Sequence, residues 1–304
     1  MEPVYGSIIR IAKGVFALEG LRFTRTGSRN IPTSGGAVIT INHTGYMDFT
    51  YAGYPAFDVG RFIRFMAKKE VFDHKVSGPL MRGMRHIPVD RASGGGSYAE
   101  AVERLRAGEL VGVFPEATIS RSFELKGFKT GAARMALEAG VPIVPLVIWG
   151  SQRVWTKGHR KNLGRTNLPI LIRAGERIAP EGTPEELTDR VKVAMTRILD
   201  ELRAEYAAEF GPYPAGAYWV PRSLGGGAPS LAEATALDEA DTAARRARRE
   251  EAAGRGAEGP AVGGGRRGRD DDGGARGRMR ALRARGAAAR TNRKNRKRKG
   301  PEVW

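Results

Sequence analysis

The chain of 304 residues contains no cysteine, which excludes disulfide bonds, cysteine nucleophiles and cysteine-ligated metal centres. It also lacks a long uninterrupted apolar run near its N-terminus, because the hydrophobic residues there are broken by Arg10 and Lys13. From these absences we expect no signal peptide and no transmembrane span. The expected compartment is the cytoplasm.

Residues that commonly bind metals are few. Three of the four histidines, His74, His86 and His159, have no histidine or carboxylate neighbour at metal-ligand spacing. We therefore expect neither a metal site nor a bound cofactor. His86 opens a predicted strand and is interpreted as a hydrogen-bonded structural residue.

Large apolar side chains are almost absent from residues 224–304, which consist mainly of alanine, glycine and arginine. Because such a segment cannot bury a hydrophobic core, we expect a mostly disordered, basic C-terminal tail. Residues 230–254 have helix-forming composition without a continuous apolar face, which predicts a partial helix at most. The rest divides into an amphipathic N-terminal helix with a linker, residues 1–29, and one domain, residues 30–223.

The chain is strongly basic, with a formal net charge of +18. Residues 224–304 hold 20 basic and 11 acidic residues and so carry +9, half of the total. A chain of this charge is expected to bind a polyanion: nucleic acid, an anionic membrane surface or a phosphorylated substrate. Charge alone does not choose among these three.

Residues 4–18 show helical periodicity, since one face collects Val4, Ile8, Ile11, Val15 and Leu18. This pattern predicts an amphipathic helix. Two placements stay open: the apolar face packs on the body of the protein, or it lies on a membrane surface.

Apolar runs typical of strands alternate with helical patterns along the central part of the chain. Strands are predicted over residues 37–41, 62–67, 86–89, 110–114, 143–148 and 170–174, and helices over residues 97–107 and 130–139. A capping box at residues 183–186, with proline at the first helical position, predicts a further helix with a core-facing stripe. This order indicates an α/β fold with a mixed, mostly parallel sheet flanked by helices.

Polar residues follow three of the predicted strands at the point where each strand ends. They are Asn42, His43 and Asp48 after the first, Asp90 and Arg91 after the third, and residues 115–118 after the fourth. Ligands of open α/β sheets bind beyond the carboxyl ends of the strands, so these segments are expected to converge on one pocket.

His43 and Asp48 are separated by four residues and have the parts of a general base. A carboxylate that holds one imidazole nitrogen protonated leaves the other nitrogen to take a proton near neutral pH. This chemistry suits acyl transfer to an alcohol.

Four blocks in this order resemble the 1-acyl-glycerol-3-phosphate acyltransferase family of phospholipid synthesis. They are Asn42-His43 with Asp48, Val89-Asp90-Arg91, the run at residues 114–118 and the run at residues 141–145. The resemblance covers roughly residues 5–210 and leaves the tail aside. It implies a glycerolipid-acyltransferase domain that converts lysophosphatidic acid to phosphatidic acid, with acyl-coenzyme A or acyl carrier protein as co-substrate.

The resemblance also implies a role for individual residues. His43 would deprotonate the acceptor hydroxyl, and Asp48 would orient it. No acyl-enzyme is needed, which fits the absence of cysteine. Arg91 matches the family's arginine for the acceptor phosphate, with Lys68 as a second candidate.

The third block departs from the family's usual Phe-Pro-Glu-Gly-Thr-Arg-Ser, because Ala117 replaces the glycine and Ile119 replaces the arginine. Glu116 and Thr118 remain to bind the acceptor's glycerol. Arg121, two residues on, is a candidate to take over the phosphate contact. The alanine suggests that the backbone at position 117 need not adopt a positive φ angle.

Several alternatives remain open at this point. The acceptor is another lysophospholipid or another alcohol in the first alternative, and in the second the protein is a non-catalytic polyanion-binding module. The tail does not interleave aromatic residues with its basic ones for stacking on bases, so we expect peripheral attachment to the cytoplasmic face of an anionic membrane and not nucleic-acid binding.

Overall fold

The computed structural model describes residues 2–90 and 95–257. The chain forms two compact units, Met1–Glu239 and Ala240–Trp304. The first unit continues past the boundary expected at residue 223, because Ala228 and Ala234 are fully buried. Arg91 and residues 258–304, which include most of the expected tail, lie outside the described residues.

A seven-stranded sheet forms the centre of the first unit, in the order β1-β7-β6-β2-β5-β3-β4. All neighbouring strands are parallel except β6 and β7, which are antiparallel. The mixed, mostly parallel sheet predicted from the sequence is confirmed. The strands are β1 (Arg22–Thr26), β2 (Ala37–Ile41), β3 (Ile63–Lys68), β4 (Ile87–Val89), β5 (Leu110–Val113), β6 (Ile143–Trp149) and β7 (Pro169–Ala174).

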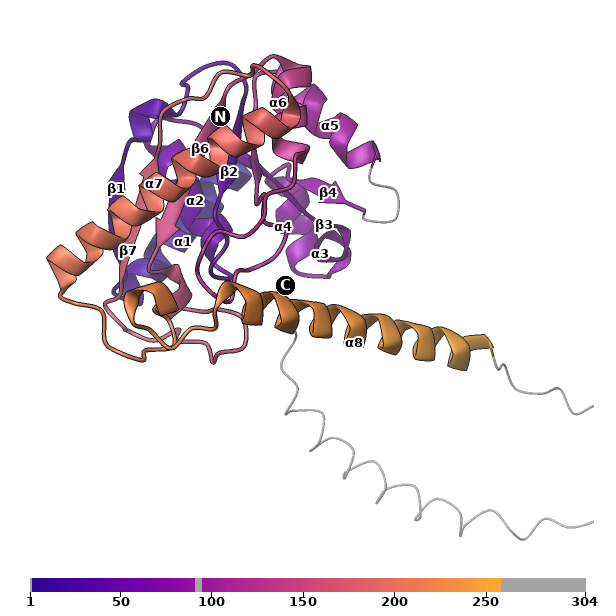
Figure 1. Cartoon of the computed structure of the whole chain (residues 1–304). Coiled ribbons are helices and arrows are strands. Elements are labelled where there is room, and N and C mark those ends of the chain that lie inside the picture. The colour runs from indigo at the N-terminus through magenta and orange to yellow at the C-terminus, as the bar shows by residue number, and fades with distance from the viewer. Residues whose placement is uncertain (1, 91–94, 258–304) are drawn as a thin grey trace, which may run out of the picture. The chain divides into compact units, whose positions relative to one another are not determined.

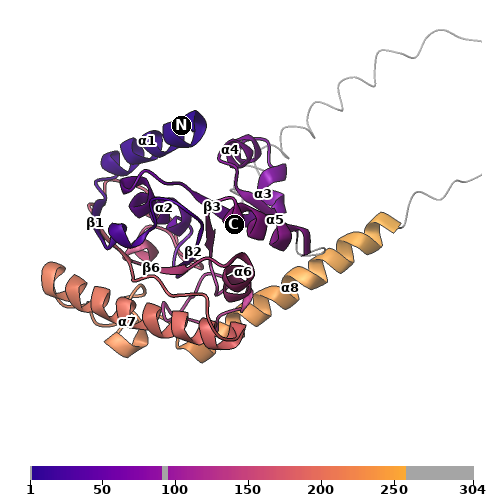
Figure 2. The same cartoon turned by 90° about the horizontal axis from the view of Figure 1, so that it is seen from above.

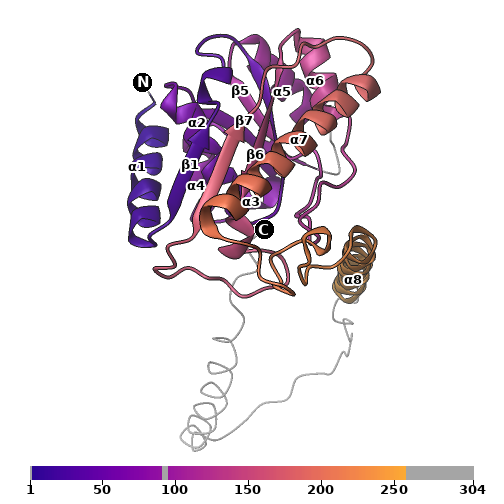
Figure 3. The ribbon, with the colours of Figure 1, turned by 60° about the vertical axis from the view of Figure 1, so that its left-hand side comes forward.

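Helices cover both faces of this sheet (Figures 1 and 2). One face packs against α1 (Pro3–Leu18) and α2 (Asp48–Asp58), and the other against α5 (Gly95–Arg106), α6 (Gly131–Ala139) and α7 (Pro184–Phe210). Two short helices, α3 (Lys69–Asp73) and α4 (Ser77–Gly83), lie beside the β3–β4 edge. Figure 3 shows α7 running across β6 and β7.

The predicted capping box at the start of α7 is confirmed. Thr183 Oγ1 accepts the Glu186 N–H at 3.2 Å, and Glu186 Oε2 accepts the Thr183 N–H at 2.8 Å. These bonds satisfy two helix-end donors that otherwise have no partner. The predicted stripe is buried along its whole length and consists of Leu187, Val191, Met195, Ile198, Leu202 and Tyr206.

Helix α8 (Leu231–Ala257) begins in the first unit. Ser230 Oγ accepts the Glu233 N–H, and Glu233 Oε2 accepts the Ser230 N–H, so Ser230 caps the start of this helix. The helix is longer than the partial helix expected from composition, and its first turns contribute the buried Ala234 to the first unit.

Helix α1 forms as predicted, but most of its predicted apolar stripe faces solvent, and other residues of the helix pack on the body. Tyr5 and Phe16 are buried against the sheet, and Ile8 packs in part. The outer face exposes Val4, Ile11, Val15 and Leu18. The linker that follows contains β1, which pairs with β7 and which the sequence pattern did not predict. No helix among residues 2–90 and 95–257 is both long and apolar enough to cross a membrane.

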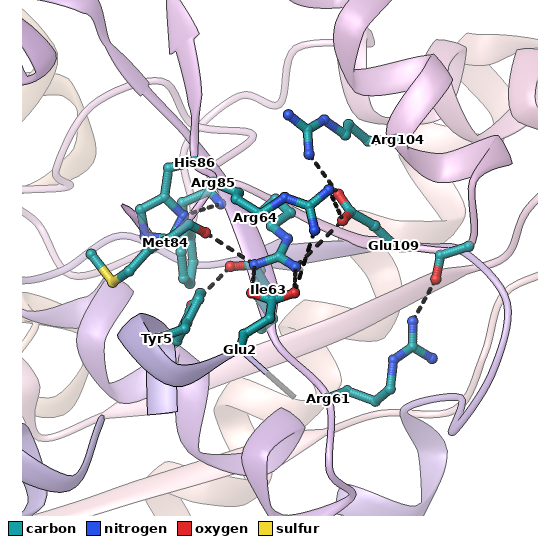
Figure 4. Close-up of polar contacts among 12 residues, drawn as sticks. Glu2, Tyr5, Arg61, Ile63, Arg64, Met84, Arg85, His86, Arg104 and Glu109 are labelled. Atoms are coloured by element: carbon teal, nitrogen blue, oxygen red, sulfur yellow. Dashed lines mark hydrogen bonds and ion pairs between the residues drawn. The ribbon is translucent and has the colours of Figure 1, made fainter. Parts of the chain in front are cut away.

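A buried arginine fastens the N-terminus to the sheet (Figure 4). Arg64 on β3 is 4% exposed and pairs with Glu2, which precedes α1, and with Glu109, which precedes β5. Its Nη1 also donates to the Met84 carbonyl at 3.0 Å. Because a buried cation is costly without partners, these acceptors fix the start of α1 against β3.

Candidate active site

The end of β2 is held in place before the chain reaches His43. The Asn42 amide donates to the Ile148 carbonyl at 2.9 Å and accepts the Ile148 N–H at 2.7 Å. Both partners lie on β6, the strand beside β2. Since Asn42 is fully buried, this pair of bonds fixes the direction in which the chain leaves the sheet.

His43 and Asp48 are in contact, as the sequence predicted. The distance between His43 Nδ1 and Asp48 Oδ2 is 3.1 Å. The same oxygen accepts the backbone N–H groups of Thr44 at 2.7 Å and Gly45 at 2.8 Å. Asp48 is fully buried at the first position of α2, where the helix dipole favours a negative charge.

These contacts define the tautomer of His43. An ionised carboxylate only accepts hydrogen bonds, so Nδ1 carries the proton and Nε2 presents a lone pair. The His43 side chain is 20% exposed, which gives a substrate access to the ring. One edge of the imidazole is therefore held, and the other is available for proton transfer.

The loop after β5 wraps around His43. Glu116 Oε1 accepts the His43 backbone N–H at 2.9 Å, and Glu116 Oε2 accepts the Lys126 N–H at 3.0 Å. The Phe114 ring stacks on the imidazole at 4.2 Å between centroids. Burial raises the pKa of Glu116 to about 7, although the two backbone N–H groups favour the ionised form. Glu116 thus orders the loop after β5, as the resemblance implied, and its contact with the acceptor stays a prediction.

The expectation for the backbone at Ala117 was wrong. Ala117 has φ = 60°, in the left-handed region that usually favours glycine. Its N–H donates to the Phe114 carbonyl at 3.0 Å, which closes a tight turn between the strand end and Thr118. The turn requires this conformation whichever residue is present, so the alanine bears a strain that glycine avoids.

Ile119, which stands at the position of the family's arginine, is 5% exposed and lies in the protein interior. Thr118 is half-buried, and its Oγ1 lies 3.5 Å from Lys157 Nζ. Arg121 is half-buried on the same loop, and its Nε donates to Asp238 at 3.3 Å.

The remaining predicted phosphate contacts are not brought to His43 by any described interaction. Lys68 ends β3 and is half-buried at the same edge of the sheet as Phe114. Arg91 is outside the described residues, and its neighbour Asp90 forms an ion pair with Lys69 at 3.3 Å. A cavity of about 360 Å³ opens beside β4, with a basic lining that includes Lys69, Arg82, Arg85 and Arg104.

Sequence reasoning missed three residues next to Arg121: Lys126, Lys157 and Asp238. Lys126 and Lys157 both contact the Asp238 carboxylate. Lys126 lies within the same loop as Glu116 and Thr118, which was a usable signal. No pattern marked Lys157 or Asp238, because their proximity depends on the fold. Within the described ranges, no three histidine or carboxylate side chains are placed to hold a metal ion.

The chain is similar to known acyltransferases. Residues 22–149 match the Acyltransferase family model. The chain is 33% identical over 136 residues to the 1-acyl-sn-glycerol-3-phosphate acyltransferase of Bacillus subtilis, covering 43% of this chain and 66% of that protein. It is 29% identical over 150 residues to the chloroplastic enzyme LPAT1 of Arabidopsis thaliana, covering 48% of this chain and 41% of that protein.

A solved structure shares the fold. It is the 1-acyl-sn-glycerophosphate (LPA) acyltransferase PlsC from Thermotoga maritima, with a TM-score of 0.52 and 23% identity over 66% of this chain and 89% of that one. The matched region spans 41% to 66% of the length of the two curated relatives above. Residues 22–149 therefore form a domain of the Acyltransferase family, and the chain is similar to the 1-acyl-sn-glycerol-3-phosphate acyltransferases named above.

Proposed function

We propose that this chain is an O-acyltransferase that converts 1-acyl-glycerol 3-phosphate to phosphatidic acid. The acyl group comes from an acyl thioester. The observation that carries the proposal is the contact of His43 Nδ1 with the buried Asp48 Oδ2 inside an acyltransferase domain. The relatives named above are acyltransferases of this substrate, which supports the choice of acceptor.

The reaction follows from the tautomer of His43. Nε2 takes the proton of the acceptor hydroxyl while the hydroxyl oxygen forms a bond to the thioester carbonyl carbon. The tetrahedral intermediate then breaks its carbon–sulfur bond, and the imidazolium returns the proton to the leaving sulfur. Asp48 stabilises the imidazolium between these two steps. No residue of the chain becomes acylated.

The acceptor is the part of the proposal with a close competitor. Another lysophospholipid or another alcohol uses the same proton transfer, because His43 acts only on the hydroxyl. The phosphate is favoured by the basic residues near the loop after β5, among which Arg121 and Lys126 are on that loop itself. Acyl-coenzyme A and acyl carrier protein serve equally well as donor in this scheme.

We also propose that the enzyme works at an anionic membrane surface. The outer face of α1 exposes Ile11 at 68% and Leu18 at 79%, and the neighbouring α4 exposes Leu80 at 44%, beside Val76 just before it at 68%. An exposed apolar patch on an amphipathic helix of a basic protein suits the boundary between head groups and acyl chains. Lysophosphatidic acid, with an acyl chain and a charged head group, partitions to that boundary.

The competing class is a non-catalytic polyanion-binding protein. The observation in its favour is the formal net charge of +18. It gives no reason for a carboxylate buried against a strand-end histidine, because that arrangement contributes nothing to a basic surface.

One experiment separates these readings. Purified protein is given oleoyl-coenzyme A with lysophosphatidic acid, glycerol 3-phosphate, other lysophospholipids or a monoacylglycerol, and the products are quantified. We expect phosphatidic acid from lysophosphatidic acid at the highest kcat/KM. Acyl transfer only to another acceptor would show that the proposed acceptor is wrong, while the proposed acyl-transfer chemistry would stand. Absence of transfer to every acceptor, with salt-sensitive binding of RNA, would favour the competing class.

A further inference from the structure

One carboxylate in the first unit is surrounded by three cations. Asp238, on the early turns of α8, lies 2.6 Å from Lys157 Nζ and 2.5 Å from Lys126 Nζ. Arg121 Nε lies 3.3 Å from the same side chain. The four side chains are only 13% to 16% exposed, so these charges meet largely out of water. Such contacts are stronger than those of exposed ion pairs.

Two of these cations, Arg121 and Lys126, belong to the loop that encloses the catalytic histidine. The Lys126 N–H donates to Glu116, and the other oxygen of Glu116 accepts the His43 N–H. The Ser120 N–H donates to the His43 carbonyl at 2.7 Å, and Arg121 is the next residue. Arg121 and Lys126 are thus each linked to His43 through one residue.

The third cation, Lys157, comes from a segment that is hydrogen-bonded to the turn after His43. Thr156 Oγ1 donates to the Thr44 carbonyl at 2.7 Å, and the Tyr46 N–H donates to the Trp155 carbonyl at 2.9 Å. Lys157 follows directly and also contacts Thr118. Segments far apart in sequence therefore direct three cations to one place beside the His43 turn.

The group that occupies this place is the carboxylate of Asp238. A carboxylate offers two oxygens and one negative charge, and here Asp238 Oδ1 serves Arg121 and Lys157 while Oδ2 serves Lys126. A phosphate monoester offers three oxygens and a charge of about −1.5 to −2 at neutral pH. Burial raises the pKa of Asp238, but the hydrogen bonds from Lys126 and Lys157 outweigh this and lower it overall. Asp238 is therefore an anion at neutral pH.

We propose that Arg121, Lys126 and Lys157 form the site for the phosphate monoester of the acceptor, and that Asp238 is an internal anion that the phosphate displaces. The proposal rests on the proposed function. It explains how the chain dispenses with an arginine at position 119, where Ile119 is buried, since the positive charge is supplied from beside that position. It also gives the start of α8 a role in acceptor binding.

The test compares Asp238→Asn with Glu239→Gln, which removes the same charge from the adjacent, exposed residue. Calorimetric titration with glycerol 3-phosphate, inorganic phosphate and coenzyme A measures binding without turnover. Loss of a partly buried ion pair changes a binding affinity by roughly 3- to 10-fold. Asp238→Asn should therefore bind glycerol 3-phosphate more tightly by about that factor. Its KM for lysophosphatidic acid should fall equally, whereas Glu239→Gln should match the wild type.

Lys157→Gln provides the opposite change in a protein that keeps Asp238. It should weaken glycerol 3-phosphate binding and raise KM for lysophosphatidic acid, with KM for monoacylglycerol unaffected. These readouts also hold if Asp238→Asn fails to fold. Equal glycerol 3-phosphate affinity in wild type and either variant would overturn the proposal.

The sources of phosphate give different results. Tighter binding of coenzyme A alone by Asp238→Asn would assign the cluster to the donor and overturn the acceptor site. A protein that transfers no acyl group, yet binds glycerol 3-phosphate more tightly in Asp238→Asn, would refute the proposed function and retain the anion site.

Discussion

The Glu116 carboxylate accepts the backbone N–H of His43 at 2.9 Å, so a buried acid of the loop after β5 positions the strand-end residue. Its other oxygen accepts the Lys126 N–H at 3.0 Å. Glu116 therefore holds the two loops of the site together.

Replacing Glu116 with glutamine should remove one of the two backbone contacts, because an amide has only one acceptor atom. The free energy of unfolding should fall by about 1 to 3 kcal/mol, the cost of an unsatisfied buried donor. The pKa of Glu116 is raised to about 7 from 4.5, so its protonation stabilises the folded state below pH 4.5, and this contribution is lost as pH rises through 7. Urea unfolding at pH 5 and pH 8 measures this loss as a decrease in the free energy of unfolding. The decrease should appear in wild type and in the exposed control Glu209→Gln, and not in Glu116→Gln.

His43→Ala should keep the fold and lower kcat by roughly 100- to 10,000-fold, the range for losing a general base. Asp48→Asn should fall between this variant and wild type, because the imidazole loses its charged partner. The matched control is His159→Ala, which removes an exposed imidazole stacked on Tyr218. Turnover near the wild-type rate in His43→Ala, with folding verified by circular dichroism, would end the proposed mechanism.

Arg91→Ala should mainly weaken acceptor binding. A charge-assisted phosphate contact contributes about 1.5 to 3 kcal/mol, which corresponds to roughly a 10- to 150-fold rise in KM for lysophosphatidic acid. The KM for the acyl donor should stay constant. An equal loss with monoacylglycerol, which has no phosphate, would show that Arg91 supports structure instead.

His86 should make the fold sensitive to acid. Its Nδ1 accepts the Phe65 N–H at 3.1 Å, and burial with help from Arg64 lowers its pKa to about 3 (Figure 4). Because the folded pKa lies below 6.5, the stabilisation is present above pH 6.5 and is lost as pH falls towards 3. His86→Gln, which keeps an acceptor, should lose this slope between pH 6.5 and 4. Glu116 has the opposite slope in part of that range, so the difference between wild type and variant is the quantity to measure.

A chain ending at Glu239 should fold and retain acyl transfer on micellar substrate, because it keeps the whole first unit. A chain ending at Leu224 loses the buried Ala228 and Ala234 and the Asp238 ion pairs, and should be less stable by roughly 1 to 3 kcal/mol. Both should bind anionic vesicles less at low salt than the full chain does, a difference that high salt reduces by screening. Identical co-sedimentation of all three proteins would show that the tail is not a membrane tether.

Much of the fold was predictable because its signals are local. The buried run at β2, the capping box at Thr183 and the periodic stripe of α7 each specify an element from neighbouring residues. Strand β1 escaped prediction because its residues are largely exposed or half-buried and its stability comes from pairing with β7. The sequence also assigned the first turns of α8 to the tail. Small residues such as Ala234 carry no clear burial signal and become buried only where another segment covers them.

The site divides in the same way. The sequence by itself determined that a histidine and an aspartate follow a buried strand, because the spacing within one turn brings them together whatever the rest of the chain does. Only the tertiary structure decided that Ala117 takes a positive φ and that Glu116 bridges two backbone N–H groups. It also decided that Asp238 meets Lys126 and Lys157, which are 112 and 81 positions away, because contacts between distant segments depend on sheet order and helix packing and leave no periodic trace in the sequence.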